Sequence, residues 1–393
     1  MSKLIFFTLV LSLSLWANSS QDQLSFFKSS YDESRSQFLD AASAFENSTS
    51  FAVNQIQFSD PKDSTLITDA VWLKAKSARR NLIVLFSGLH GIEGFTGSAL
   101  QSWLLRQRLL TQATSTDYLL VHALNPYGFK AKRRATAENI DLNRNFMLNE
   151  SHFSTANPAY AELDSFLNPT SEAQLGFFHR IGFLFSALKL VAQHSIGALR
   201  QAILVGQYQF PKGIFYGGTT HQYQKQIVDQ LYKDVMLNYE TVFIVDIHTG
   251  YGAKNKLHLL ANSKTQPSAQ ELNSIFGEER IDYGDKTHFY QVRGDMLSYL
   301  EAKSSTSPKH KILGVAFEFG TLDSQKTLGS IESLRRIVIE NQKHHHGADP
   351  DSIPGIESLY LEMFYPTNEH WRTNTVQQFD LEMVQIEAFL KGH

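Results

Sequence analysis

Residues 82–94, LIVLFSGLHGIEG, join an apolar run to a glycine-rich turn that carries a histidine and a glutamate. The run at 82–86 has no polar interruption, which favours a strand covered on both faces, as in parallel sheets. A helical pattern follows at 96–110, and a second apolar run at 118–123 predicts another buried strand. Buried strands that alternate with amphipathic helices are typical of an α/β fold with a largely parallel sheet.

The rest of the chain continues this alternation. Three further strands are predicted at 241–247, 257–261 and 312–319, and three further helices at 222–238, 325–341 and 376–390. Residues 18–59 mix polar and aromatic side chains and are interpreted as a surface helix with connections.

The segment 149–239 is predicted to be a mainly helical insertion that walls the active site. Its most apolar part, residues 177–191, carries His179, Arg180 and Lys189. These polar and charged groups favour a packed helix over a membrane span.

Composition excludes several classes of function. The formal net charge of -3 gives no basic face for a nucleic acid. The absence of cysteine excludes disulfides, thiol nucleophiles and cysteine zinc sites, so any metal must be held by histidine and carboxylate. With 42% hydrophobic residues the chain can bury a large core, and we expect one catalytic domain over residues 18–393.

The N-terminus has the pattern of a secretory signal peptide. Lys3 supplies a positive charge, residues 4–16 are apolar, and Ala17 offers a small residue for cleavage. The run is too short for a spanning helix, so we expect a signal peptide at 1–17 and no stable membrane span after its removal. The mature protein would be secreted, and periplasmic if the source is a Gram-negative bacterium.

Three residues form a candidate metal site. His90 and Glu93 follow one buried strand and His248 ends another, where open α/β sheets gather their ligands. A catalytic zinc site keeps three protein ligands and one open position. Asp246 lies two residues before His248, on the same face of a strand, and could orient its imidazole.

A buried carboxylate, Glu318, interrupts the apolar strand at 312–319. Burying an unpaired acid costs several kcal/mol, which functional sites tolerate, so Glu318 is a candidate general base. A buried salt bridge to an arginine is the alternative. Arg133 and Arg134, followed by DLNRNF at 141–146, could bind carboxylates or a developing oxyanion, or could form a solvated surface run.

The histidine triplet at 344–346 follows a predicted helix in a polar turn. A solvated loop is favoured there over a metal site, because a short histidine tract is only a compositional hint.

The order HGIEG, NPYG, DLNRNF, DIHTG and FEFG resembles the zinc carboxypeptidases of the carboxypeptidase A type, and is similar to the branch of aspartoacylase and succinylglutamate desuccinylase. In its overall sequence pattern, the chain most resembles an uncharacterised bacterial subgroup of these proteins. The resemblance implies a three-layer α/β/α sandwich around a mixed, mostly parallel sheet. It also implies one Zn²⁺ per chain.

The resemblance assigns roles to individual residues. It implies His90, Glu93 and His248 as zinc ligands and Glu318 as general base and acid. Arg134 would polarise the scissile carbonyl, while Asn143 and Arg144 would receive the substrate carboxylate. The tyrosine that caps the substrate in carboxypeptidases has two candidates, Tyr290 and Tyr299, and neither lies in a recognisable motif.

Three functions remain open. The first is a metallocarboxypeptidase acting on peptides, and the second is a deacylase of N-acyl amino acids, which would need a small closed pocket rather than an open cleft. The third is a secreted binding protein that has lost activity on the same scaffold, which the presence of Glu318 disfavours.

Overall fold

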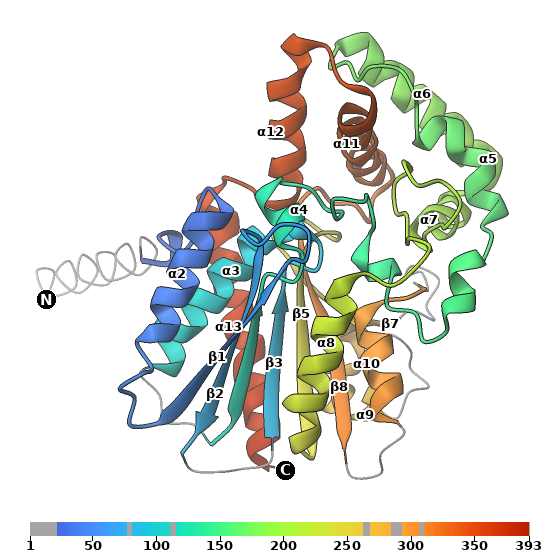
Figure 1. The fold of residues 1–393 in the computed structure, drawn as a ribbon. Helices are drawn as coiled ribbons and strands as arrows, with labels where there is room; N and C mark the ends of the chain where they lie inside the picture. The colour runs from blue at the N-terminus through green and yellow to red at the C-terminus, as the bar shows by residue number, and fades with distance from the viewer. Residues whose placement is uncertain are drawn as a thin grey trace, which may run out of the picture.

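The computed structural model describes residues 22–76, 81–110, 115–261, 268–283, 293–305 and 310–392. The predicted signal peptide at 1–17 and the candidate Tyr290 lie outside these residues. Figure 1 shows a central twisted sheet with helices on both faces and further helices above the ends of its strands.

The sheet has the order β1-β2-β4-β3-β5-β8-β6-β7. Its centre, β4-β3-β5-β8, is parallel, and antiparallel pairs join β1 to β2, β2 to β4 and β6 to β8. The strands are β1 (Phe51–Ser59), β2 (Ile67–Ala75), β3 (Asn81–Ser87), β4 (Asp117–His122), β5 (Thr241–Gly250), β6 (Leu257–Ala261), β7 (Ile281–Tyr283) and β8 (Lys311–Gly320). The predicted fold class, a mixed and mostly parallel sheet between helical layers, is confirmed.

Helices bury both faces of this sheet. Alternate residues of β3 point to opposite faces: Ile83 and Leu85 pack with α2, α3, α9 and α13, whereas Leu82 and Val84 pack with α8 and α10. The helices are α2 (Tyr31–Ser43), α3 (Gly94–Trp103), α4 (Pro126–Lys130), α5 (Pro158–Leu167), α6 (Phe177–His194), α7 (Ile196–Leu204), α8 (Tyr223–Asp234), α9 (Ser268–Phe276), α10 (Met296–Ser304), α11 (Thr327–His346), α12 (Ile353–Phe364) and α13 (Glu369–Gly392). The continuous apolar runs of the sequence are therefore explained by burial on both sides.

The first two strands were not predicted. The segment interpreted as a surface helix with connections contains α2 but also β1, which pairs antiparallel with β2 along nine positions. Of the nine residues of β1 only Phe51 is fully buried, because β1 is the edge of the sheet. Its hydrophobic signal is correspondingly weak.

Helices α5, α6, α7, α11 and α12 stand above the ends of the parallel strands (Figure 1). Ala187 is the only fully buried residue of α6, and the outer side of this helix exposes large apolar residues. The expected packed helix at 177–191 is thus packed along one side only. Among the described residues no single helix is long and apolar enough to cross a membrane; α6 and α7 meet the length and composition test only as a pair, bent by 105°.

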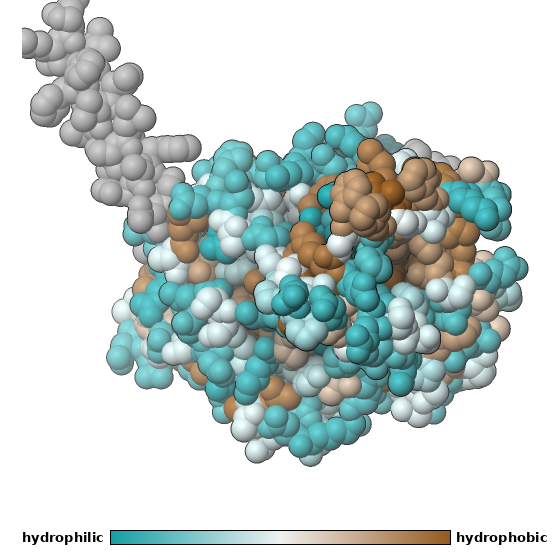
Figure 2. Space-filling model, turned by 90° about the horizontal axis from the view of Figure 1, so that it is seen from above, coloured by the Kyte–Doolittle hydropathy of each residue, from teal (hydrophilic) through white to brown (hydrophobic). Residues whose placement is uncertain are grey.

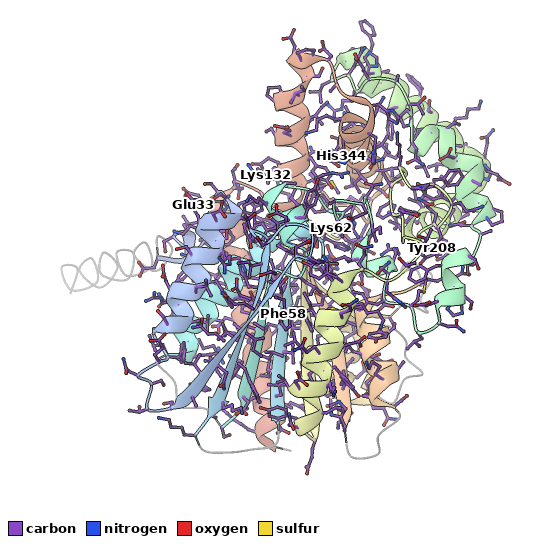
Figure 3. The ribbon with its side chains drawn as sticks, in the orientation of Figure 1. Glu33, Phe58, Lys62, Lys132, Tyr208 and His344 are labelled. Atoms are coloured by element: carbon purple, nitrogen blue, oxygen red, sulfur yellow. The ribbon has the colours of Figure 1, made fainter. Side chains whose placement is uncertain are left out.

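The prediction of a solvated loop for the histidine triplet at 344–346 is wrong. These residues form the last turn of α11. Burial lowers the pKa of His344 and His345 to about 4, and Gly347, with φ +81°, follows the helix end. Figure 3 shows His344 on α11, well above the sheet.

Candidate metal centre and active site

The turn after β3 places His90 and Glu93 above the sheet. Gly88 adopts φ +66°, which only glycine reaches without strain, and the chain then forms a short 3₁₀ turn over Gly91–Glu93 before α3. Gly91 lies against Gly128, so a Cβ at this position would lie 2.1 Å from the Gly128 carbonyl carbon. The glycines of HGIEG and NPYG therefore allow two turns to touch. NPYG begins the five-residue helix α4, with Asn125 as its N-cap.

His90, Glu93 and His248 form a group that could hold a metal ion, and all three are buried. The Nδ1 atoms of the two histidines lie 3.1 Å apart, and the Glu93 oxygens lie 3.0 Å from His90 Nδ1 and 2.8 Å from His248 Nδ1. Two ligand atoms bound to one tetrahedral zinc lie about 3.3 Å apart, from Zn–N distances near 2.05 Å. Donor set and spacing therefore fit a zinc ion with little movement.

Acidic side chains hold the far sides of both imidazoles. Asp246 Oδ2 lies 2.7 Å from His248 Nε2, as Asp246 was expected to do, and Asp141 Oδ1 lies 3.2 Å from His90 Nε2. Such contacts leave Nδ1 of each ring for a metal and fix the ring orientation. Asp141 is not among the predicted site residues; its position between Arg134 and Arg144 is the sequence signal that could have identified it.

Opposite charges dominate the electrostatics of this group. Burial acts to raise the pKa of Glu93, but His90 and His248 outweigh it and hold that pKa well below its usual range. Burial likewise opposes ionisation of Asp141, yet Arg134 and Arg144 keep its pKa well below normal. Both carboxylates are therefore ionised, as a cation site requires.

Glu318 lies beside this group in the sheet. It is the register partner of His248 across the parallel pair β5 and β8, so both side chains project from the same face. Glu318 Oε1 accepts a hydrogen bond of 2.8 Å from the backbone N–H of Tyr251. Burial, and next the charge of Glu93, raise the pKa of Glu318 to about 8.

The two adjacent arginines have different partners. Arg134 lines the cavity above the sheet; its Nη2 lies 2.6 Å from His90 Nε2 and its Nε donates to Asp141 at 3.0 Å. Arg133 points the other way, where its Nε donates to Glu340 of α11 at 2.9 Å. The pair is therefore not a solvated run, and only Arg134 lies at the candidate site.

Asn143 and Arg144 also line this cavity. Asn143 Oδ1 accepts from the backbone N–H of Met296, which leaves its Nδ2 group available as a donor. Arg144 is 1% exposed; its two terminal nitrogens donate to the carbonyls of Asn143 and Leu204, and its Nε makes no hydrogen bond with the described residues. Arg144 thus places a positive charge at the wall of the cavity, which suits an anionic ligand.

The structure brings all seven predicted site residues to one region. A cavity of about 420 Å³ is lined by His90, Arg134, Asn143, Arg144, His248 and Glu318. Glu93 contacts His90 and His248. Tyr299 does not belong to this region, because its hydroxyl contacts Asp229 and its ring packs on Phe146. Tyr251 lines the cavity instead.

The segment between α7 and α8 closes the arginine side of the cavity. Tyr208, labelled in Figure 3, donates its hydroxyl proton to the carbonyl of Arg144 at 2.8 Å. Phe215 places its ring 5.5 Å from the Arg134 guanidinium and 5.6 Å from that of Arg144. The predicted insertion thus contributes directly to the wall of the site.

Solved structures with similar folds include several hydrolases. Carboxypeptidase A from Helicoverpa armigera is 12% identical, with a TM-score of 0.47 over 83% of this chain and 75% of that one. Murein-tripeptide amidase from Escherichia coli O157 is 14% identical, with a TM-score of 0.35 over 77% and 96%. An aspartoacylase family protein from Mesorhizobium loti is 11% identical, with a TM-score of 0.36 over 77% and 69%.

No curated protein sequence matches the chain. A family model does, and it covers residues 27–378, most of the described structure. The chain therefore belongs to the family DUF2817, which is described as a protein of unknown function.

Proposed function

We propose that the protein is a zinc-dependent hydrolase that cleaves an amide bond next to a substrate carboxylate, in the simplest case a metallocarboxypeptidase acting on peptides. The observation that carries this proposal is the buried group of His90, Glu93 and His248, with Glu318 paired to His248 at the same cavity. Two imidazoles, one carboxylate and an acid beside them are the parts that hydrolysis by an activated water requires.

Each residue has a role that follows from its place. His90, Glu93 and His248 would hold the zinc ion, which when bound lowers the pKa of water towards about 7 and polarises a carbonyl. Glu318 would accept the proton of the attacking water and return it to the leaving nitrogen. Arg134 would stabilise the negative oxygen that develops on the scissile carbonyl.

Asn143 and Arg144 would orient the substrate by its carboxylate. The support is that both side chains line the cavity together with His90 and His248. Bidentate pairing of a guanidinium with a carboxylate adds direction as well as energy. We also propose, from the pattern at residues 1–17, that the protein is exported.

A deacylase of N-acyl amino acids is the second candidate. It is favoured by the insertion, because residues of α5, α6 and α7 line the cavity together with residues of α11. An N-acyl amino acid would use the same carboxylate site and the same amide chemistry.

The test is the metal content of the purified protein, for the wild type and for His248→Ala, with hydrolysis of blocked dipeptides and N-acyl amino acids. We expect about one zinc ion per chain, lost in the variant, and cleavage that also requires Glu318. A protein that neither contains nor takes up a divalent metal would instead be a binding protein on a hydrolase scaffold.

A further inference from the structure

The cavity has two ends of different chemistry. Its floor carries the polar residues described above, at the ends of β5 and β8. Its opposite end, called here the apolar chamber, is lined by Leu163, Phe166, Leu199, Ile203, Leu334 and Ile337. These residues come from α5, α7 and α11 and belong to a hydrophobic cluster separate from both faces of the sheet.

The apolar chamber begins at the arginines. Phe215 belongs to its cluster and also contacts the guanidinium groups of Arg134 and Arg144. The terminal nitrogen of Arg144 donates to the carbonyl of Leu204, the last residue of α7. Because Phe215 also contacts Arg134, the arginine proposed at the scissile carbonyl, an acyl chain that continues from that carbonyl would reach the chamber past this ring.

Helix α6 forms the roof of the chamber. Ala187, Leu190 and Val191 line the cavity, whereas Phe177 and Phe178 on the same helix are 73% and 85% exposed. Figure 2 shows apolar side chains gathered on this upper face, on the side where α5 and α6 lie in Figure 1.

Helix α6 itself carries basic and no acidic residues, and its Arg180 lies 3.7 Å from Glu332 of α11. Residues 173–228 contain no Asp or Glu but include Arg180 and Lys189 on α6. An apolar surface with positive charges attracts amphiphiles that carry a negative group. The outer face and the inner lining of α6 therefore suit the same kind of molecule.

We propose that the substrate is an N-acyl amino acid, or a short acylated peptide, whose acyl group is a long aliphatic chain held in the apolar chamber. This inference rests on the proposed function. Hydrolysis breaks the C–N bond of the amide: water supplies hydroxyl to the acyl carbon and a proton to the nitrogen, releasing a fatty acid and the amino acid. Arg144 binds the amino acid carboxylate and the chamber binds the methylenes.

The first test is hydrolysis of N-acetyl-, N-octanoyl- and N-dodecanoylglycine by the zinc-loaded protein. Each buried methylene should raise kcat/KM about threefold to fourfold until the chamber is filled. Equal rates across the series would overturn the chain inference and leave the proposed hydrolase standing. If the protein cleaved none of these substrates and no blocked dipeptide, the chain inference and the proposed hydrolase would both be refuted.

The second test is binding of N-dodecanoylglycine and N-acetylglycine to zinc-loaded Glu318→Gln, measured by calorimetry. The longer ligand should bind at least tenfold more tightly. Adding Ala187→Trp, which fills the chamber, should abolish this difference, while Ala192→Trp on the exposed side of the same helix should keep it. If Ala187→Trp fails to fold, Val191→Gln replaces it, and an unchanged preference in that variant contradicts the proposal.

Discussion

Replacement of Asp246 by asparagine tests how the sheet prepares His248 for a metal. Asp246 is 1% exposed and its Oδ2 lies 2.7 Å from His248 Nε2. Burial acts to lower the pKa of His248, and Asp246 is the largest of the groups that raise it well above normal. The variant keeps the shape and can keep a neutral hydrogen bond, but it removes the charge that makes the imidazole a stronger ligand.

The expected effect is a loss of zinc affinity. Removing such a partner typically costs 10- to 100-fold, which corresponds to about 1.4–2.8 kcal/mol of binding free energy. Competition titration against a chelator of known affinity measures it directly. The matched control is Asp117→Asn on β4, a buried acid of the same sheet that accepts from Ala75 N and Tyr239 Oη.

An unchanged affinity in Asp246→Asn would refute the orienting role of this carboxylate. An equal loss in Asp117→Asn would show that the effect comes from a general disturbance of the sheet. Circular dichroism spectra of the two variants should overlay with that of the wild type, because neither substitution changes side-chain size.

Glu318→Gln should retain bound zinc but hydrolyse substrate about a hundred- to ten-thousand-fold more slowly, because proton transfer is lost; loss of metal content would place Glu318 among the ligands instead. Arg133→Met should lower the free energy of unfolding by about 3 kcal/mol or more, because it leaves Glu340 buried and unpaired. Urea titration measures this, and a change within error would contradict a structural role. His122 is fully buried against Ser98, and burial lowers its pKa to about 4. The unfolded chain protonates this group near pH 6.5 and the folded protein does not, so its stability contribution should fall by about 3 kcal/mol between pH 6.5 and 4. His122→Gln should flatten that part of the stability profile, and an identical profile would refute the assignment.

The central strands could be predicted because strands buried on both faces have uninterrupted apolar sequences. The run at 82–86 corresponds to β3, and 257–261 coincides with β6. The edge strand β1 could not, since one buried residue in nine leaves no period to detect. A local pattern reports how a segment is buried, and edge strands owe their place to backbone pairing rather than to burial.

The candidate site shows the same division. His90, Glu93, His248 and Glu318 could be selected because each follows or interrupts a buried strand. The choice between Arg133 and Arg134 could not be made from their own surroundings, since it depends on Glu340, more than two hundred residues later in the chain. The role of Asp141 likewise depends on distant partners. The apolar chamber could not be predicted for the same reason, because four separate helices, α5, α6, α7 and α11, form it.

The pairing of His248 with Glu318 has a consequence for how metal and fold depend on each other. A ligand and the candidate base face each other across the hydrogen-bonded pair β5 and β8, two central strands of the sheet. We expect amide protons in these paired central strands to exchange with solvent mainly through large-scale opening, so that the site has close to the opening free energy of the domain. Zinc would therefore bind to a site that is already folded. Chelation would remove only the stability that zinc binding adds by mass action. Zinc fingers differ, because they unfold without their metal.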